Sequence, residues 1–224
     1  MFVHITTRIE GHPYDDLLQK NGFRGFPTLA ILDDEGAVLT SEVGRSVDAM
    51  SEAIDGIASL IDLEKREKAG EEGLETDLFK ARLRLGKIDL AEAKTKLAEL
   101  DLSDAERKEL DSILFGKEMM EWVMDPIGGP DAAMTKVYEA YKAGRRPDDS
   151  EQSQSLFYQI LLDAAEKADD ADAFEFAYKV LIPMMRASIN KQAESIPEDQ
   201  REQYLEGAKA FFKQFEDRLK KIKG

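Results

Sequence analysis

The chain has 224 residues, of which 42% are hydrophobic and 34% are charged, and its formal net charge is −15. This composition is typical of a globular protein with one or two domains, and no apolar run approaches the roughly 18–20 residues that cross a membrane. The acidic balance predicts no nucleic-acid partner, because phosphate backbones repel a negative surface. The absence of cysteine excludes disulfides, thiolate nucleophiles, zinc–thiolate sites and dithiol exchange within this chain.

The sequence leaves two cellular compartments as alternatives. Met1–Thr6 has a strand-like pattern and lacks the basic start, apolar run and cleavage site of a signal peptide. The chain is therefore expected in the cytoplasm if Met1 is the native start, or outside it if an upstream leader has been removed.

The first predicted elements are a strand, a short helix and a second strand. Phe2–Thr6 is rich in β-branched residues, which favours a strand. Pro13 stands just ahead of a short helix over Tyr14–Lys20. Leu29–Asp33 is apolar at consecutive positions, which is typical of a strand covered on both faces.

A hairpin and a long helix complete the first 63 residues. Asp34-Glu35-Gly36 predicts a tight turn into an edge strand over Ala37–Glu42, where Thr40 and Ser41 are polar. Ser46 is a candidate N-cap for the helix that follows. One stripe of that helix is apolar and is predicted to face the core: Val47, Met50, Ile54, Ile57, Ala58 and Ile61.

This order of elements resembles the C-terminal half of a thioredoxin fold over about residues 2–63. Gly25-Phe26-Pro27-Thr28 is similar to the cis-proline loop of that family, and Asp34-Glu35-Gly36 is similar to its last hairpin turn. The break at Gly44 before the long helix also matches. The resemblance implies a cis bond before Pro27.

The same resemblance implies a peptide-binding site. In thioredoxin-like proteins the backbone beside this proline pairs with an extended peptide, so Phe26, Pro27 and Thr28 would face such a peptide. The other interpretation is a structural turn that keeps its geometry without binding anything.

The part of the family's fold that carries Cys-X-X-Cys has no counterpart in this chain. The strand missing with it lies at the centre of the family's sheet, so backbone groups on both sides would lose their partners. Either the remaining strands pair directly, or another chain supplies the strand. The second possibility predicts a homodimer through the incomplete sheet.

Residues 74–224 are predicted to form a separate helical domain after a charged linker that contains Gly70 and Gly73. The expected helices are Leu74–Leu85, Asp89–Leu100, Ser103–Trp122, Ala132–Ala143, Ser150–Ala168, Ala171–Ile189 with a kink at Pro183, and Glu198–Lys223. Seven residues of the first two resemble one tetratricopeptide-type helix pair: Leu78, Ala81, Leu85, Gly86, Ile88, Ala91 and Ala98. Phe79 and Thr95 depart from that motif, and no second copy follows.

Other candidate sites favour structural interpretations. His4 and His12 lack a third ligand at metal spacing, so packing or surface roles are expected. Two acidic clusters, Asp33-Asp34-Glu35 and Asp169-Asp170-Asp172, lack calcium-loop spacing and are predicted to be turns and helix starts. Arg145-Arg146 is interpreted as a solvated loop rather than an anion site. The aromatic residues of the last helix are expected to be core rather than a binding groove: Tyr204, Phe211, Phe212 and Phe215.

The sequence therefore predicts an α+β, mostly α protein: a truncated thioredoxin-like module over 1–63 and a helical domain over 74–224. The predicted function is non-catalytic protein binding or scaffolding, with a protein or extended peptide as partner and no cofactor, metal or membrane. The alternative is the C-terminal part of a longer thioredoxin-like thiol-disulfide oxidoreductase whose Cys-X-X-Cys half lies elsewhere. The coding sequence upstream of the Met1 codon distinguishes the two.

Overall fold

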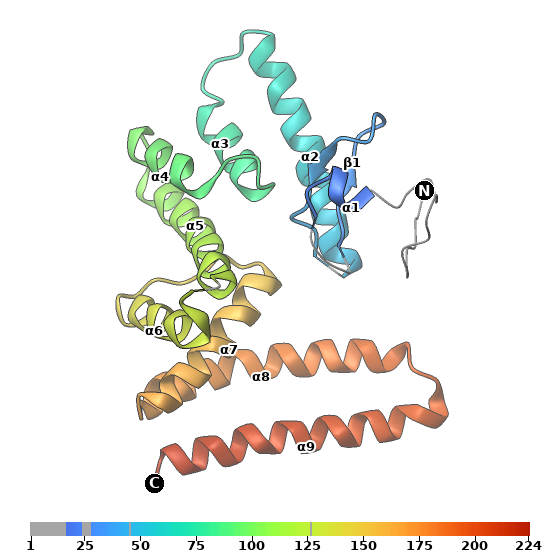
Figure 1. Cartoon of the computed structure of the whole chain (residues 1–224), viewed down its shortest axis with the longest axis vertical. Helices are drawn as coiled ribbons and strands as arrows, with labels where there is room; N and C mark the ends of the chain where they lie inside the picture. The colour runs from blue at the N-terminus through green and yellow to red at the C-terminus, as the bar shows by residue number, and fades with distance from the viewer. Residues whose placement is uncertain (1–16, 24–27, 45, 126) are drawn as a thin grey trace. The chain divides into compact units, whose positions relative to one another are not determined.

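The computed structural model describes residues 17–23, 28–44, 46–125 and 127–224. It is mostly helical and contains a two-stranded antiparallel sheet, which confirms the coarse fold class (Figure 1). The chain divides into two compact units, Met1–Asp101 and Leu102–Gly224. The thioredoxin-like module and the domain bounds 1–63 and 74–224 stay predictions.

In its described residues, the first unit contains a hairpin, a short helix and three longer helices. Its elements are α1 (Leu17–Lys20), β1 (Ile31–Leu32), β2 (Val38–Thr40), α2 (Val47–Lys68), α3 (Glu75–Arg84) and α4 (Leu90–Glu99). The predicted strand Phe2–Thr6 lies outside the described residues. The strands predicted over 29–33 and 37–42 pair as expected but are shorter, with Ile31 opposite Thr40 and Leu32 opposite Val38.

The core of the first unit lies between α2, α3 and the hairpin. Its buried residues are Ile57, Leu60, Leu63, Leu74, Leu78 and Leu85, with Ile31, Leu39 and Ala81 packed against them. The N-cap prediction is confirmed, because Ser46 Oγ accepts a hydrogen bond from the Ala49 amide at 3.1 Å. An ion pair between Arg82 and Glu64 at 3.2 Å also joins α3 to α2.

The second unit is all helical in its described part. Its helices are α5 (Asp104–Met124), α6 (Gly129–Lys142), α7 (Glu151–Lys167), α8 (Ala171–Glu194) and α9 (Glu198–Ile222). Ser103 and Glu106 form a complete capping box at the start of α5. α6 begins earlier than predicted because Pro130 sits in its first turn, where no amide donor is needed. α8 passes through Pro183 and ends five residues beyond Ile189.

Aromatic side chains form the centre of the second unit. Phe115, Phe157 and Phe174 come from α5, α7 and α8, and all three are fully buried. The rings of Phe115 and Phe157 meet edge to face, with centroids 5.8 Å apart. Phe215 and Leu219 bring the C-terminal half of α9 against this core.

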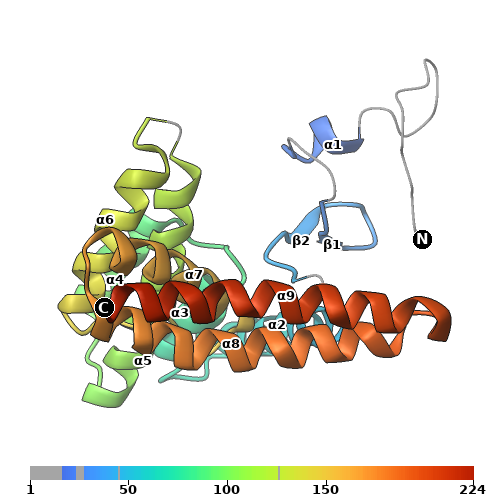
Figure 2. The ribbon, with the colours of Figure 1, turned by 90° about the horizontal axis from the view of Figure 1, so that it is seen from below.

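α8 and α9 form a long antiparallel pair, which lies side by side in both views (Figure 1, Figure 2). Far from the aromatic core, Tyr204 of α9 donates a hydrogen bond to Gln192 of α8 at 2.8 Å. Nearer the core, Arg186 of α8 lies over the ring of Phe212, 4.9 Å from its centroid. Among the helices described, none is long and apolar enough to cross a membrane.

Candidate protein-binding surfaces

Only one of the three residues predicted to face a peptide is described. Thr28 is half-buried and lies three residues ahead of β1. Phe26, Pro27 and the predicted cis bond between them lie outside the described residues, as do His4 and His12. The peptide-binding role of Phe26, Pro27 and Thr28 is therefore still a prediction.

The hairpin beside Thr28 has two different edges. Its turn is held by Asp33, whose Oδ1 accepts hydrogen bonds from the amides of Glu35 at 3.0 Å and Ala37 at 2.8 Å. Gly36 occupies the left-handed region with φ of 86°, which glycine adopts without strain. In the described part of the chain, β2 is the one strand paired with β1. A peptide strand would therefore add on the other side of β1.

The edge of β2 is tied to the turn between α3 and α4. Lys87 Nζ donates a hydrogen bond to the carbonyl of Val38 at 3.0 Å. Thr40 Oγ1 donates to the carbonyl of Leu85 at 3.0 Å and accepts from the amide of Glu42 at 3.0 Å. Thr40, a polar residue of the predicted edge strand, is 2% exposed, because the turn between α3 and α4 covers it.

α2 buries a different face from the one predicted. Ala53, Ile57, Leu60 and Leu63 are its buried residues. Of the predicted stripe only Ile57 is buried, whereas Val47, Ile54 and Ile61 are 76%, 56% and 42% exposed. We call these three residues the apolar stripe of α2. They repeat every seven residues, just under two helical turns, and so form one line along the helix.

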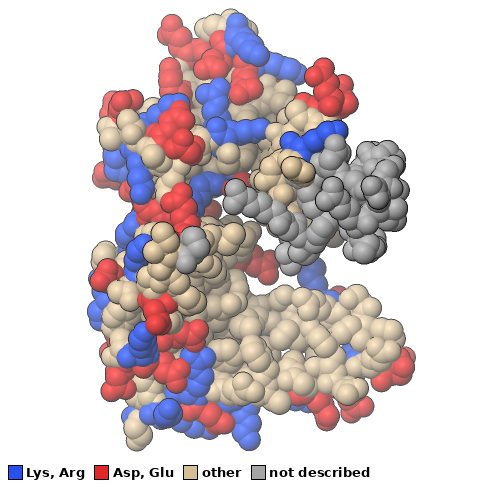
Figure 3. All heavy atoms as spheres, viewed as in Figure 1, with Lys and Arg blue, Asp and Glu red and all other residues tan. Residues whose placement is uncertain are grey.

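The second unit also exposes apolar side chains. Met120, Val123 and Met124 at the end of α5 are exposed, and Ile127 in the following turn is 95% exposed. On α9, Phe212 is buried, Tyr204 and Phe215 are half-buried, and Phe211 is 37% exposed. The prediction that this aromatic stripe is core therefore holds for Phe212 and not for Phe211. The face of the α8–α9 pair seen in Figure 3 is largely uncharged.

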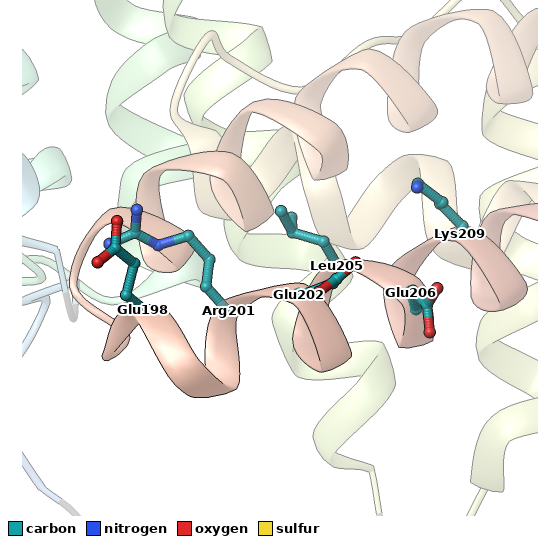
Figure 4. A pocket seen from close by; sticks show the side chains of 6 residues that line it. All are labelled: Glu198, Arg201, Glu202, Leu205, Glu206 and Lys209. Carbon is teal, nitrogen blue, oxygen red and sulfur yellow. The ribbon is translucent and has the colours of Figure 1, made fainter.

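A shallow hollow on α9 has no enclosing wall from another element. Its lining residues are Glu198, Arg201, Glu202, Leu205, Glu206 and Lys209, all from this one helix (Figure 4). Glu198 and Arg201 point toward one another, and Arg201 Nη2 donates a hydrogen bond to the carbonyl of Ile196 at 3.1 Å. Small-molecule sites are concave and bury most of their ligand, so this hollow does not support one.

Arg145 and Arg146 lie in the loop after α6, and both also contact other residues of the protein. Arg145 Nη2 lies 2.7 Å from Glu118 Oε2, and its guanidinium stacks 4.5 Å from the centroid of Phe115. Arg146 stacks on Tyr141 at 4.4 Å and donates to its carbonyl at 3.1 Å. Arg145 is exposed and Arg146 is half-buried, so the residues lie in a loop at the surface as predicted, and these contacts hold that loop after α6.

Three hydrogen-bond donors surround the carboxylate of Asp170 in the second unit. Its carboxylate accepts hydrogen bonds from the amide of Ala173 at 2.9 Å, the hydroxyl of Tyr138 at 2.7 Å and the ammonium of Lys142 at 3.1 Å. In that order, these donors lower the pKa of Asp170 to about 2. Asp170 is the N-cap of α8 and Asp172 lies in its first turn, which confirms the predicted helix start.

Asp170→Asn is expected to destabilise the second unit by about 1–2 kcal/mol at pH 7, because a lowered folded-state pKa stabilises the charged form. This stabilisation is present above pH 4 and is lost as the pH falls from about 4 toward 2. Urea unfolding followed by the fluorescence of Trp122, the single tryptophan of the sequence, measures the free energy of unfolding. The difference in free energy of unfolding between wild type and variant should be smaller at pH 3 than at pH 7. Asp172→Asn is the control, and an equal loss there would contradict the role of Asp170.

No group of His, Asp or Glu in the described part of the chain is arranged to hold a metal ion. Comparison with protein-family models, curated proteins and solved structures finds no match to this chain.

Proposed function

We propose that the chain is a non-catalytic protein-binding or scaffolding protein and that its first unit binds through the apolar stripe of α2. The exposure of Val47, Ile54 and Ile61 carries the proposal. Fully burying one such side chain stabilises a complex by roughly 1.5–3 kcal/mol before the costs of association. Three such side chains in one line on a helix therefore supply a binding face.

Replacing all three stripe residues with serine should abolish the retention of specific partners while the fold survives, because exposed side chains add little to the core. Quantitative mass spectrometry of proteins retained by the immobilised chain measures this. Each candidate is then titrated as a purified protein by calorimetry. The matched control is Val123→Ser with Ile127→Ser, which removes exposed apolar side chains from the second unit. If every retained protein binds the triple variant as well as wild type, the stripe is not the binding face.

Under the alternative function, the apolar stripe of α2 is the surface that the missing part of a thioredoxin-like fold would cover. In such a fold the last helix packs against a sheet, so the exposed line on α2 would be covered by strands supplied from a Cys-X-X-Cys half. An in-frame strand–helix–strand segment with Cys-X-X-Cys upstream of the Met1 codon would favour this alternative.

We further propose that β1 offers an edge for self-association or for an extended peptide beside Thr28. A dimer would have about twice the mass of the 25.2 kDa chain, and light scattering over a concentration series detects it. Leu32→Lys should weaken the dimer, because a charge on an edge strand opposes pairing. Val123→Lys is the control for added charge. A strictly monomeric wild type at about 100 μM, far above ordinary micromolar affinities, would rule out self-association.

A further inference from the structure

We infer that the apolar stripe of α2 binds a basic amphipathic helix of a partner protein. This inference rests on the proposed function and names the chemistry of the partner. It comes from a second line of residues on α2, which lies beside the stripe.

Each stripe residue is followed by an aspartate: Val47-Asp48, Ile54-Asp55 and Ile61-Asp62. Asp48, Asp55 and Asp62 are exposed, and we call them the aspartate row. One residue is about 100° around an α-helix, so the row runs parallel to the stripe over the same length of about four turns. The helix therefore presents an apolar line with a negative line on one side.

The other side of the stripe belongs to the core of the first unit. Ile57 and Leu60 lie there and are buried against α3 and the hairpin. A partner on the stripe thus meets aspartates along one flank and the protein's own apolar packing along the other. Its cations are expected along one flank only.

The amino-acid sequence up to Leu63 is also acidic. Residues 1–63 contain 4 basic and 11 acidic side chains, a net charge of −7. Asp62 lies 3.8 Å from Arg66, but Arg66 is held more closely by Glu71, with its Nε donating at 2.8 Å. The pKa of Glu71 is lowered chiefly by that hydrogen bond, so Arg66 also pairs with a carboxylate outside the aspartate row. Lysine or arginine on a partner is the complement of this surface.

The seven-residue period argues for a helix as the occupant. Side chains that repeat at this spacing match the two-turn repeat of a second helix packed nearly parallel or antiparallel to the first. From Val47 to Ile61 the stripe spans about 21 Å at 1.5 Å per residue, so a partner helix of about 15 residues covers it. β-branched side chains in such a line are common where two helices pack.

A second copy of α2 packed antiparallel to the first fits less well than a basic helix. In an antiparallel two-fold pair the aspartate rows of both copies would lie on the same side of the interface and repel. A partner with apolar residues at three- and four-residue spacing and lysines along one flank avoids that repulsion.

The test uses two synthetic 21-residue peptides with identical leucines at heptad core positions and either lysines or glutamates on the flank. Calorimetry with the full chain at about 50 mM and 300 mM salt measures binding. The lysine peptide should bind and weaken with salt, because screening reduces charge attraction. The glutamate peptide should bind at least tenfold more weakly.

Two sets of variants distinguish the contribution of the apolar stripe to peptide binding from that of the aspartate row. Asp48→Asn, Asp55→Asn and Asp62→Asn together should weaken the lysine peptide about tenfold, as three exposed ion pairs would. The control Glu99→Gln, Glu202→Gln and Glu206→Gln removes the same total charge from other exposed positions and should change affinity less than threefold. Ile54→Ser with Ile61→Ser should abolish binding. Thermal unfolding by circular dichroism confirms that each variant folds.

The outcomes are distinguishable. Binding that needs the stripe but is equal for both peptides, or equally weakened by the control, overturns the basic-helix inference and leaves the proposed function standing. Binding that follows charge but does not depend on Ile54 and Ile61 is nonspecific attraction and overturns the inference. No binding of the lysine peptide at about 100 μM overturns the inference, while the partner-retention experiment decides the proposed function.

Discussion

Phe174→Ala is expected to lower the free energy of unfolding of the second unit by about 3–5 kcal/mol, the range for a large aromatic side chain removed from a core. Phe174 of α8 is fully buried in the aromatic core of the second unit, and the cation of Arg218 lies 5.4 Å from its ring centroid. A loss of this size is a large share of the 5–15 kcal/mol that stabilises a typical domain. The variant should therefore unfold at much lower urea concentration.

Trp122 gives a selective readout of this change. It is the only tryptophan of the sequence and packs against the same core as Phe174. Phe211→Ala is the matched control, since the side chain of Phe211 is 37% exposed and should cost about 1 kcal/mol or less. Equal destabilisation by the two substitutions would show that the aromatic core is not where the structure places it.

Thr40→Val is the second change with a large expected effect, about 1–3 kcal/mol on the first unit. The hydroxyl of Thr40 bridges the carbonyl of Leu85 and the amide of Glu42 in a buried position. Valine has nearly the same shape but cannot hydrogen-bond, so both backbone groups lose their partner. The hairpin should then separate more readily from the turn between α3 and α4.

Hydrogen exchange followed by mass spectrometry measures this opening, with faster exchange expected in peptides that cover residues 38–42 and 85–88. Thr95→Val is the control, because the Thr95 hydroxyl bonds to Ala91 within its own exposed helix. Unchanged exchange at residues 38–42 in Thr40→Val would mean that the hydroxyl does not hold the hairpin.

The apolar stripe of α2 shows that a repeating pattern can be found in the sequence and still be predicted wrongly as core rather than surface. The residues of the apolar stripe stand out by their period, and the sequence placed them together on one helix face. That face was predicted to be core, whereas it is exposed. The error arises because α2 is apolar over more than half of its circumference, so periodicity alone offers two faces for burial.

What the sequence by itself determined are the features that depend on neighbours within a few residues. Ser46, Ser103 and Asp170 start helices in the structure as they were predicted to, because a side-chain oxygen three residues before a free amide is sufficient for a cap. The Asp34-Glu35-Gly36 turn also follows from local chemistry, since Asp33 bonds to amides two and four residues ahead.

The tertiary structure alone decided which groups are buried by distant partners. Leu85 lies 45 residues from Thr40, and its carbonyl makes a polar strand residue part of the interior. In the same way, the hairpin and α3 cover Ile57 and Leu60 and leave Val47, Ile54 and Ile61 at the surface. The choice between two apolar faces of one helix is made by the elements that pack against it, because burial is a property of the neighbours in space and not of the residue.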